Sequence, residues 1–186
     1  MKVVSCETHI VATPPPHVGG MYWIFVQLRT ACGIEGVGEV YAATFHPEVM
    51  SKAIADVFSR YLEGKNPHHI ERLYREAFSS GFTQRPDLTM MGVLSGLEMA
   101  CWDIVGKAAG LPVYELIGGK VHDKLRSYTY LYPKDARGNY DYDNVELAVE
   151  CALENREKGF TALKFDPAGP YTAYSGQMLS LEGMDK

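Results

Sequence analysis

Two side chains that could take part in proton transfer stand at the end of one short apolar segment of this chain. The segment, Gly159 to Pro167 or GFTALKFDP, begins with a glycine that can end a helix and continues as a strand that carries Lys164 and Asp166 at its end. A half-desolvated lysine at a strand end can have its pKa lowered toward neutrality and so exchange protons at pH 7. Because barrel enzymes place their reactive groups at the C-terminal ends of their strands, the segment predicts the first chemistry-bearing strand of an α/β barrel.

The residues before this strand predict the elements that must position it. Their pattern is strand, helix, strand, which predicts a parallel βαβ unit. The expected elements are a strand over Ser127–Tyr132, a helix over Asp141–Lys158 that ends at Gly159, and a strand over Phe160–Asp166. Tyr130 and Tyr132 lie near the end of the first strand, where alternate side chains point into a barrel mouth. One of the two can hydrogen-bond a substrate while the other packs.

A small antiparallel sheet followed by helices is expected before this unit. Segments rich in β-branched and aromatic residues predict a three-stranded antiparallel meander over Lys2–Ala12, Met21–Thr30 and Ile34–Tyr41. Steps of three and four between apolar residues then predict helices. They are expected from Pro47 to about Gly64, from a restart at Asn66-Pro67, over Leu88–Ala109, which is apolar nearly all round, and briefly after Pro112.

Composition and charge exclude several classes of partner. The formal net charge is −5 and no cluster of lysine and arginine is present, which argues against binding to nucleic acid. We expect no membrane partner, because no apolar window long enough to cross a bilayer and no secretory signal stand out, so a cytoplasmic location is predicted. The four cysteines are far apart without CxxC spacing and are expected to be buried, reduced thiols.

The run from Gly96 to Gly119, GLEMACWDIVGKAAGLPVYELIGG, closely resembles the linker helix and double-glycine signature of the mandelate racemase and muconate lactonizing branch of the enolase superfamily. That resemblance implies an α+β capping domain over residues 1–124, followed over 125–186 by the first β/α units of a TIM-type (β/α)7β barrel. A complete eight-stranded barrel takes roughly 250 residues. The chain is therefore expected to be part of a longer protein.

The resemblance also implies a chemistry, the removal of a proton α to a carboxylate through an ene-diolate that magnesium stabilises. Ligands for Mg are expected beyond residue 186, with none in this chain. The leading hypothesis is a sugar-acid dehydratase or cycloisomerase, a small-molecule enzyme that forms a homo-oligomer. Two alternatives stay open: a racemase or epimerase of the same family, and a non-catalytic capping or assembly module if the chain is complete as given.

At the second barrel strand the family carries a Lys-x-Lys motif, and this chain has Lys164-Phe165-Asp166. Lys164 is expected to act as base or acid, or to balance the substrate carboxylate as the first lysine often does in relatives. Asp166 departs from the pattern, because a carboxylate cannot serve as a cation. It could bind a sugar hydroxyl, orient Lys164 or act as a base, and otherwise it forms a turn before Pro167.

Two stretches of the expected capping domain are candidates for closing the site. In relatives the loop after the first strand and the segment after the third reach over the barrel mouth, which here means Thr13–Tyr22 and Ala42–Pro47. We expect His46, Tyr22 and His17, together with Tyr130 on the barrel strand, to contact substrate. For a lone histidine a structural role is as common as a functional one.

Overall fold

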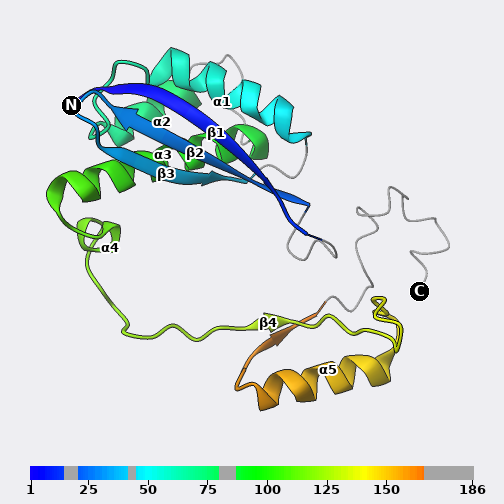
Figure 1. Cartoon of the computed structure of the whole chain (residues 1–186). Helices are drawn as coiled ribbons and strands as arrows, with labels where there is room; N and C mark the ends of the chain where they lie inside the picture. Colours follow the sequence, from blue (N-terminus) through cyan, green and yellow to red (C-terminus); the bar gives the residue numbers. More distant parts are fainter. Residues whose placement is uncertain (15–20, 42–44, 80–86, 166–186) are drawn as a thin grey trace. The chain divides into compact units, whose positions relative to one another are not determined.

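The computed structural model describes residues 1–14, 21–41, 45–79 and 87–165. It divides the chain into two compact units, Met1–Val121 and His122–Lys186 (Figure 1). We call them the cap unit and the βαβ unit.

A three-stranded antiparallel sheet forms one layer of the cap unit, as predicted. Its strands are β1 (Val3–Ala12), β2 (Tyr22–Thr30) and β3 (Glu35–Val40), in the order β1-β2-β3. Along β2 the side chains of Ile24, Val26 and Leu28 are buried, and those between them are exposed or half-buried. Since alternate side chains of a strand point to opposite faces, one face of the sheet packs on a core and the other does not.

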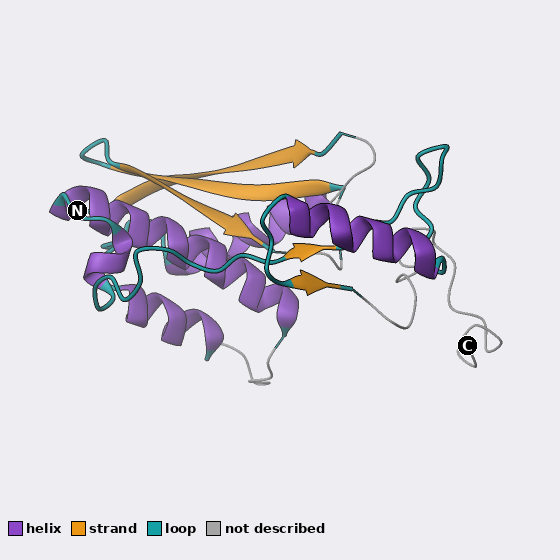
Figure 2. Ribbon diagram, turned by 90° about the horizontal axis from the view of Figure 1, so that it is seen from below, coloured by secondary structure: helices purple, strands orange, loops and turns teal. Residues whose placement is uncertain are grey.

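Helices form the second layer of the cap unit. They are α1 (Pro47–Tyr61), α2 (Ile70–Phe78), α3 (Leu88–Ala109) and the short α4 (Val113–Leu116). Figure 2 shows the helices of this unit on one side of the strands. The core between the layers consists of Val3, Ile24, Val26, Leu28, Val40, Met50, Ile54, Val57, Phe58, Leu62, Ile70, Leu73, Ala77, Val93, Leu94, Leu97, Ala100, Cys101 and Ile104.

Glycines let α3 and β3 approach backbone to backbone. A Cβ placed on Gly38 would lie 2.0 Å from the carbonyl oxygen of Gly96, and one on Gly36 would lie 2.1 Å from that of Ala100. Neither position has room for a methyl group, because real contacts of this kind are far longer. The absence of side chains at Gly36 and Gly38 therefore sets the distance between the sheet and its main helix.

Polar side chains of α3 cover the free edge of β3. Asp103 Oδ2 accepts a hydrogen bond from the backbone N–H of Val37 at 2.9 Å, and Lys107 Nζ donates to the carbonyl of Glu35 at 2.9 Å. Lys107 and Asp103 also pair with each other at 2.8 Å. An edge strand offers unpaired backbone groups to other chains, and this pair of side chains satisfies two of them.

The α2 helix begins later than the sequence pattern predicts. Asn66 and Pro67 do not start it; instead the N–H of His69 donates to the carbonyl of Asn66 at 3.0 Å, and Asn66 Oδ1 accepts from the N–H of His68 at 3.2 Å. Asparagine competes for local backbone donors in this way and stabilises a turn. The helix then starts at Ile70.

Judged by length and composition, the prediction that no segment could span a bilayer is wrong. Among the described residues, α3 passes that test. Its side chains at Val93, Leu97 and Ile104 are nevertheless buried in the cap unit. The core helix of a soluble domain can be apolar on most sides, and α3 contributes much of the buried cluster of the cap unit.

All four cysteines are free, as expected, but they are not all buried. Cys101 is buried and Cys6 is half-buried, and burial raises the pKa of these thiols to about 12 and about 11. Cys32 instead lies exposed in the turn between β2 and β3, where a hydrogen bond with Thr30 lowers its pKa.

The described part of the βαβ unit contains two short parallel strands and one helix. These are β4 (Thr129–Tyr130), α5 (Val145–Glu157) and β5 (Leu163–Lys164). In the described residues, β4 and β5 are shorter than the predicted strands Ser127–Tyr132 and Phe160–Asp166, and they pair with each other. The helix starts at Val145, where Asn144 Oδ1 caps it by accepting from the N–H of Leu147 at 3.1 Å.

Candidate functional site

Lys164 lies at the carboxyl end of β5, directly opposite Tyr130 of β4. The parallel register pairs Thr129 with Leu163 and Tyr130 with Lys164, and the N–H of Leu131 donates to the carbonyl of Lys164 at 2.9 Å. The Lys164 side chain is exposed, and its Nζ lies 5.6 Å from the ring centroid of Tyr130. The two predicted strand-end residues are therefore neighbours, in a cation–π geometry.

Tyr130 is the first of four tyrosines whose rings follow one another. Centroid distances are 5.3 Å from Tyr130 to Tyr132, 6.0 Å from Tyr132 to Tyr140 and 5.7 Å from Tyr140 to Tyr142. These spacings are within the range of attractive aromatic pairs. We call this set the tyrosine row.

A small hairpin after β4 brings the second half of the tyrosine row back to the first. Lys134 and Tyr140 form an antiparallel bridge, and the Lys134 ammonium lies 5.1 Å from the Tyr140 ring centroid. The turn is fixed by Asp135, whose Oδ1 accepts from the N–H groups of Asn139 at 2.8 Å and Arg137 at 2.9 Å. Hydrogen bonds from the Asn139 backbone and side chain, followed by those from nearby amides, hold the pKa of Asp135 below its usual value.

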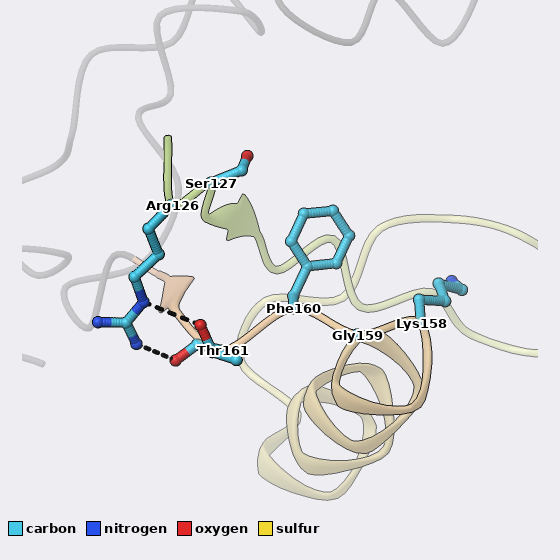
Figure 3. Close-up of a pocket in the computed structure, with 6 residues that line it drawn as sticks. All are labelled: Arg126, Ser127, Lys158, Gly159, Phe160 and Thr161. Atoms are coloured by element: carbon cyan, nitrogen blue, oxygen red, sulfur yellow. Dashed lines mark hydrogen bonds between the residues drawn. The ribbon is translucent and has the colours of Figure 1, made fainter. Parts of the chain in front are cut away.

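The amino ends of the same two strands border a different feature, a hollow of about 290 Å³ (Figure 3). Arg126 donates from Nε to Thr161 Oγ1 at 2.8 Å and from Nη2 of its guanidinium to the Thr161 carbonyl, and Figure 3 shows these two bonds. Ser127, Lys158, Gly159 and Phe160 complete the lining. The side chains at this end hold the strands together, whereas Lys164 and Tyr130 stand at the other end.

In the cap unit, one predicted contact residue binds the residue that precedes another. Tyr22 at the start of β2 donates its hydroxyl to the carbonyl of Phe45 at 2.8 Å, next to His46. His46 is the N-cap of α1, and its Nδ1 accepts from the N–H of Glu48 at 3.4 Å. An acceptor role at Nδ1 leaves the ring proton on Nε2, so that nitrogen is the one available to a ligand. Capping is the structural role that the histidine already has.

Two predicted site residues, Asp166 and His17, lie outside the described residues. Among the residues that are described, no group of three histidine, cysteine or acidic side chains is arranged to hold a metal ion. Sequence reasoning missed Lys134, Tyr140 and Tyr142 as neighbours of the strand-end site. Their signal was an excess of tyrosine at short spacing, at positions 128, 130, 132, 140 and 142.

The model of the mandelate racemase / muconate lactonizing enzyme N-terminal domain matches residues 7–118. The chain belongs to this family. The match ends at Gly118, within the double glycine that follows α4, so it lies within the cap unit. A D-galactonate dehydratase from Xanthomonas oryzae pv. oryzae (strain PXO99A) is 31% identical over 144 residues, 77% of this chain and 35% of that protein.

Solved structures also resemble this chain, and they do so beyond the residues that the family model matches. A protein from Burkholderia SAR-1, described as a candidate mandelate racemase/muconate lactonizing enzyme, is 72% identical with a TM-score of 0.89, covering 100% of this chain and 46% of that one. An enolase from Pantoea ananatis with bound D-gluconate and Mg is 30% identical with a TM-score of 0.71, covering 89% and 36%. The chain thus spans about a third of the curated relative and less than half of these structures.

Proposed function

We propose that the whole protein is a sugar-acid dehydratase or cycloisomerase of the enolase superfamily, which begins by removing the proton α to a carboxylate. The observation that carries the proposal is the position of Lys164 at the carboxyl end of a parallel strand, in a chain related to a D-galactonate dehydratase. The Pantoea ananatis enolase with bound gluconate supports the same substrate class. The substrate we propose is a small polyhydroxylated acid.

Residues 1–124 serve in this proposal as the capping domain, and residues 125–186 as the first β/α units of a TIM-type barrel. The parallel pairing of β4 and β5 around α5 supports that assignment. So do the exposed apolar side chains of the helix: Val145, Val149 and Leu153 recur every four residues and are 70%, 53% and 51% exposed. A stripe of this spacing is suited to packing against further barrel helices.

Lys164 supplies positive charge where the reaction develops negative charge. Removing a proton next to a carboxylate produces a dianion that water stabilises poorly, so a nearby ammonium lowers its energy. In this role Lys164 faces the substrate carboxylate, and in the alternative role it exchanges the proton itself. Asp166 then binds a sugar hydroxyl, orients Lys164 or acts as the base, and the absence of a second lysine favours dehydration over racemisation.

Magnesium is part of the proposal because the gluconate-bound enolase also holds Mg. The described residues do not fit a metal site, since no suitable cluster of ligands occurs among them. The ligands are therefore expected from polypeptide outside the described residues, and the steps assigned to this chain do not depend on them.

The cap unit contributes to substrate choice in this proposal. Tyr22 and His46 lie together beside the ends of the two stretches that precede β2 and α1. His17 belongs to the first stretch and is included with them. We further propose a homo-oligomer located in the cytoplasm, as suits an enzyme that acts on soluble sugar acids.

The substitution Lys164→Met tests the proposal in the protein expressed from its whole reading frame. Methionine keeps a similar volume and removes the ammonium, so turnover of a verified sugar acid should fall by about 100-fold to 10,000-fold. The melting temperature should hardly change, because the side chain is exposed. Turnover within about threefold of the parent would exclude Lys164 from the chemistry.

A further inference from the structure

The Lys164 ammonium lies next to the ring of Tyr130, and the ring of Tyr130 in turn lies against that of Tyr132. The Tyr130 ring lies 5.6 Å from Nζ, on the adjacent strand and at the same level of the ladder. Side chains paired across a parallel ladder point to the same face of the sheet. The register therefore places the two side chains next to each other on the same face of the sheet.

Tyr132 supports Tyr130 from the next position on the same side of the strand, at 5.3 Å between centroids. Tyr140 supports Tyr132 in turn, from the returning arm of the hairpin, at 6.0 Å. The Lys134 ammonium covers Tyr140 at 5.1 Å from the centroid. The row thus runs from the hairpin to Lys164, and each ring restricts the next.

Hydrogen bonds in the turn of the hairpin fix the hairpin end of the tyrosine row. Asp135 binds the Asn139 side chain through Oδ2 at 3.2 Å, in addition to its two backbone contacts. The carbonyl of Pro133 accepts from the N–H of Asp141 at 3.0 Å, which closes the two arms. Gly138, with φ at +83°, occupies the left-handed position that the turn needs.

We propose that Tyr130 is a positioning residue that holds the Lys164 ammonium at the end of β5, with Tyr132 and Tyr140 as its support. The inference rests on the proposed function, in which Lys164 faces the carboxylate of a sugar acid. An aromatic face attracts an ammonium, and it restricts a side chain that otherwise samples many rotamers. Tyr130 thereby fixes where the positive charge stands before the substrate arrives.

The test compares Tyr130→Leu with Tyr130→Phe in the protein expressed from its whole reading frame. Phenylalanine keeps the ring and leucine removes it. With ¹³C-labelled lysine, the terminal methylene signal of Lys164, assigned by its loss in Lys164→Arg, should be shifted upfield by the ring. We expect that shift to persist in Tyr130→Phe and to disappear in Tyr130→Leu.

Kinetics provide the second arm of the test. A small misplacement of a catalytic group can cost about 100-fold, so kcat/KM for the sugar acid should fall by about 10- to 100-fold in Tyr130→Leu. In Tyr130→Phe the fall should be clearly smaller than in Tyr130→Leu, because the ring face remains and only the hydroxyl, a candidate for substrate contact, is lost. The pair Tyr140→Leu and Tyr140→Phe tests the support at a distance: the leucine variant should reduce the Lys164 shift, and the phenylalanine variant should not.

The outcomes separate this inference from the proposed function. A Lys164 signal that is the same in the parent and in Tyr130→Leu would overturn the positioning role. So would a lost shift with unchanged kcat/KM. If the parent protein dehydrated or isomerised no sugar acid, the proposed function would fail, and the spectra would still decide whether Tyr130 holds Lys164.

Discussion

The cap unit and the βαβ unit bury their apolar side chains to different extents. Every member of the buried apolar cluster belongs to the cap unit, from Val3 in β1 to Ile104 in α3. In the described part of the βαβ unit, Leu131 and Pro133 are the buried residues, and α5 has none. One unit buries a core of its own, while the described part of the other leaves the apolar side chains of α5 at least partly exposed.

Because of this difference, we expect the cap unit to determine stability and the βαβ unit to carry the proposed chemistry. The cap unit derives its structure from internal contacts, such as the backbone approach of α3 to β3. The βαβ unit carries Lys164 and the tyrosine row, yet Phe165 next to Lys164 is 62% exposed. We therefore expect changes in the cap unit to affect folding first, and changes in the βαβ unit to affect turnover first.

The difference between the two units is tested most directly by expressing each unit separately. Residues 1–121 should fold alone and melt cooperatively, with an unfolding enthalpy on the order of 80 kcal/mol. Residues 122–186 should show no cooperative transition, because little apolar area is buried there to offset chain entropy. Calorimetry and near-ultraviolet circular dichroism measure both. Cooperative melting of the second piece would mean that its core is complete.

The next largest effect is expected from Gly38→Ala in the cap unit. The new methyl group would lie 2.0 Å from the Gly96 carbonyl oxygen, so α3 and β3 must move apart. We expect a loss of about 3 kcal/mol or more in the free energy of unfolding, measured by urea denaturation.

Gly33→Ala is the matched control for this substitution. Gly33 has φ at +88° and no atom within 4 Å of the added Cβ, so alanine there introduces backbone strain without a collision. A cost of about 1–2 kcal/mol is expected. Equal losses at Gly38 and Gly33 would show that the helix and strand can separate easily.

A smaller effect is expected at the covered edge of β3. Asp103→Ala leaves the N–H of Val37 without its acceptor and should cost about 1–2 kcal/mol. Asp103→Asn keeps an acceptor oxygen and should restore most of that stability. Urea denaturation of both variants tests the contact, and a neutral Asp103→Ala would mean that solvent replaces the carboxylate.

The smallest effect is a pH dependence confined to the hairpin of the βαβ unit. The pKa of Asp135 is lowered on folding, so its stabilising hydrogen bonds are fully present above the ordinary pKa of about 4 and are lost as pH falls through the lower, folded value. Protection of the Arg137 and Asn139 amides, measured relative to their intrinsic exchange rates at each pH, should therefore fall at acidic pH. Asp135→Asn should remove this pH dependence, and identical profiles in parent and variant would contradict it.

Much of the cap unit follows from local sequence. The apolar run predicted a helix over Leu88–Ala109, and α3 has these bounds because Asp87 caps its start and Gly110 adopts φ of +67° at its end. The predicted start of α2 was wrong because the side chain of Asn66 accepts a hydrogen bond from the backbone N–H two residues ahead. Capping and turn chemistry act over a few residues, so a sequence reveals them only in part.

Less of the site could be predicted. The position of Lys164 at a strand end followed from the apolar segment before it, but its contact with Tyr130 depends on the register of two parallel strands. Register is set by pairing between segments far apart in the chain. The place of Tyr140 depends likewise on the Asp135 turn, which folds the hairpin back.

The hydrogen bond from Tyr22 to the Phe45 carbonyl joins two segments that are far apart in the sequence. It fixes the point where β2 begins relative to the residue that precedes the cap of α1. A graft that replaces either segment alone from a relative would have to recreate this joint, or it would shift the other segment as well. Recombination libraries for this scaffold should therefore exchange the two segments as one block, with Tyr22 retained.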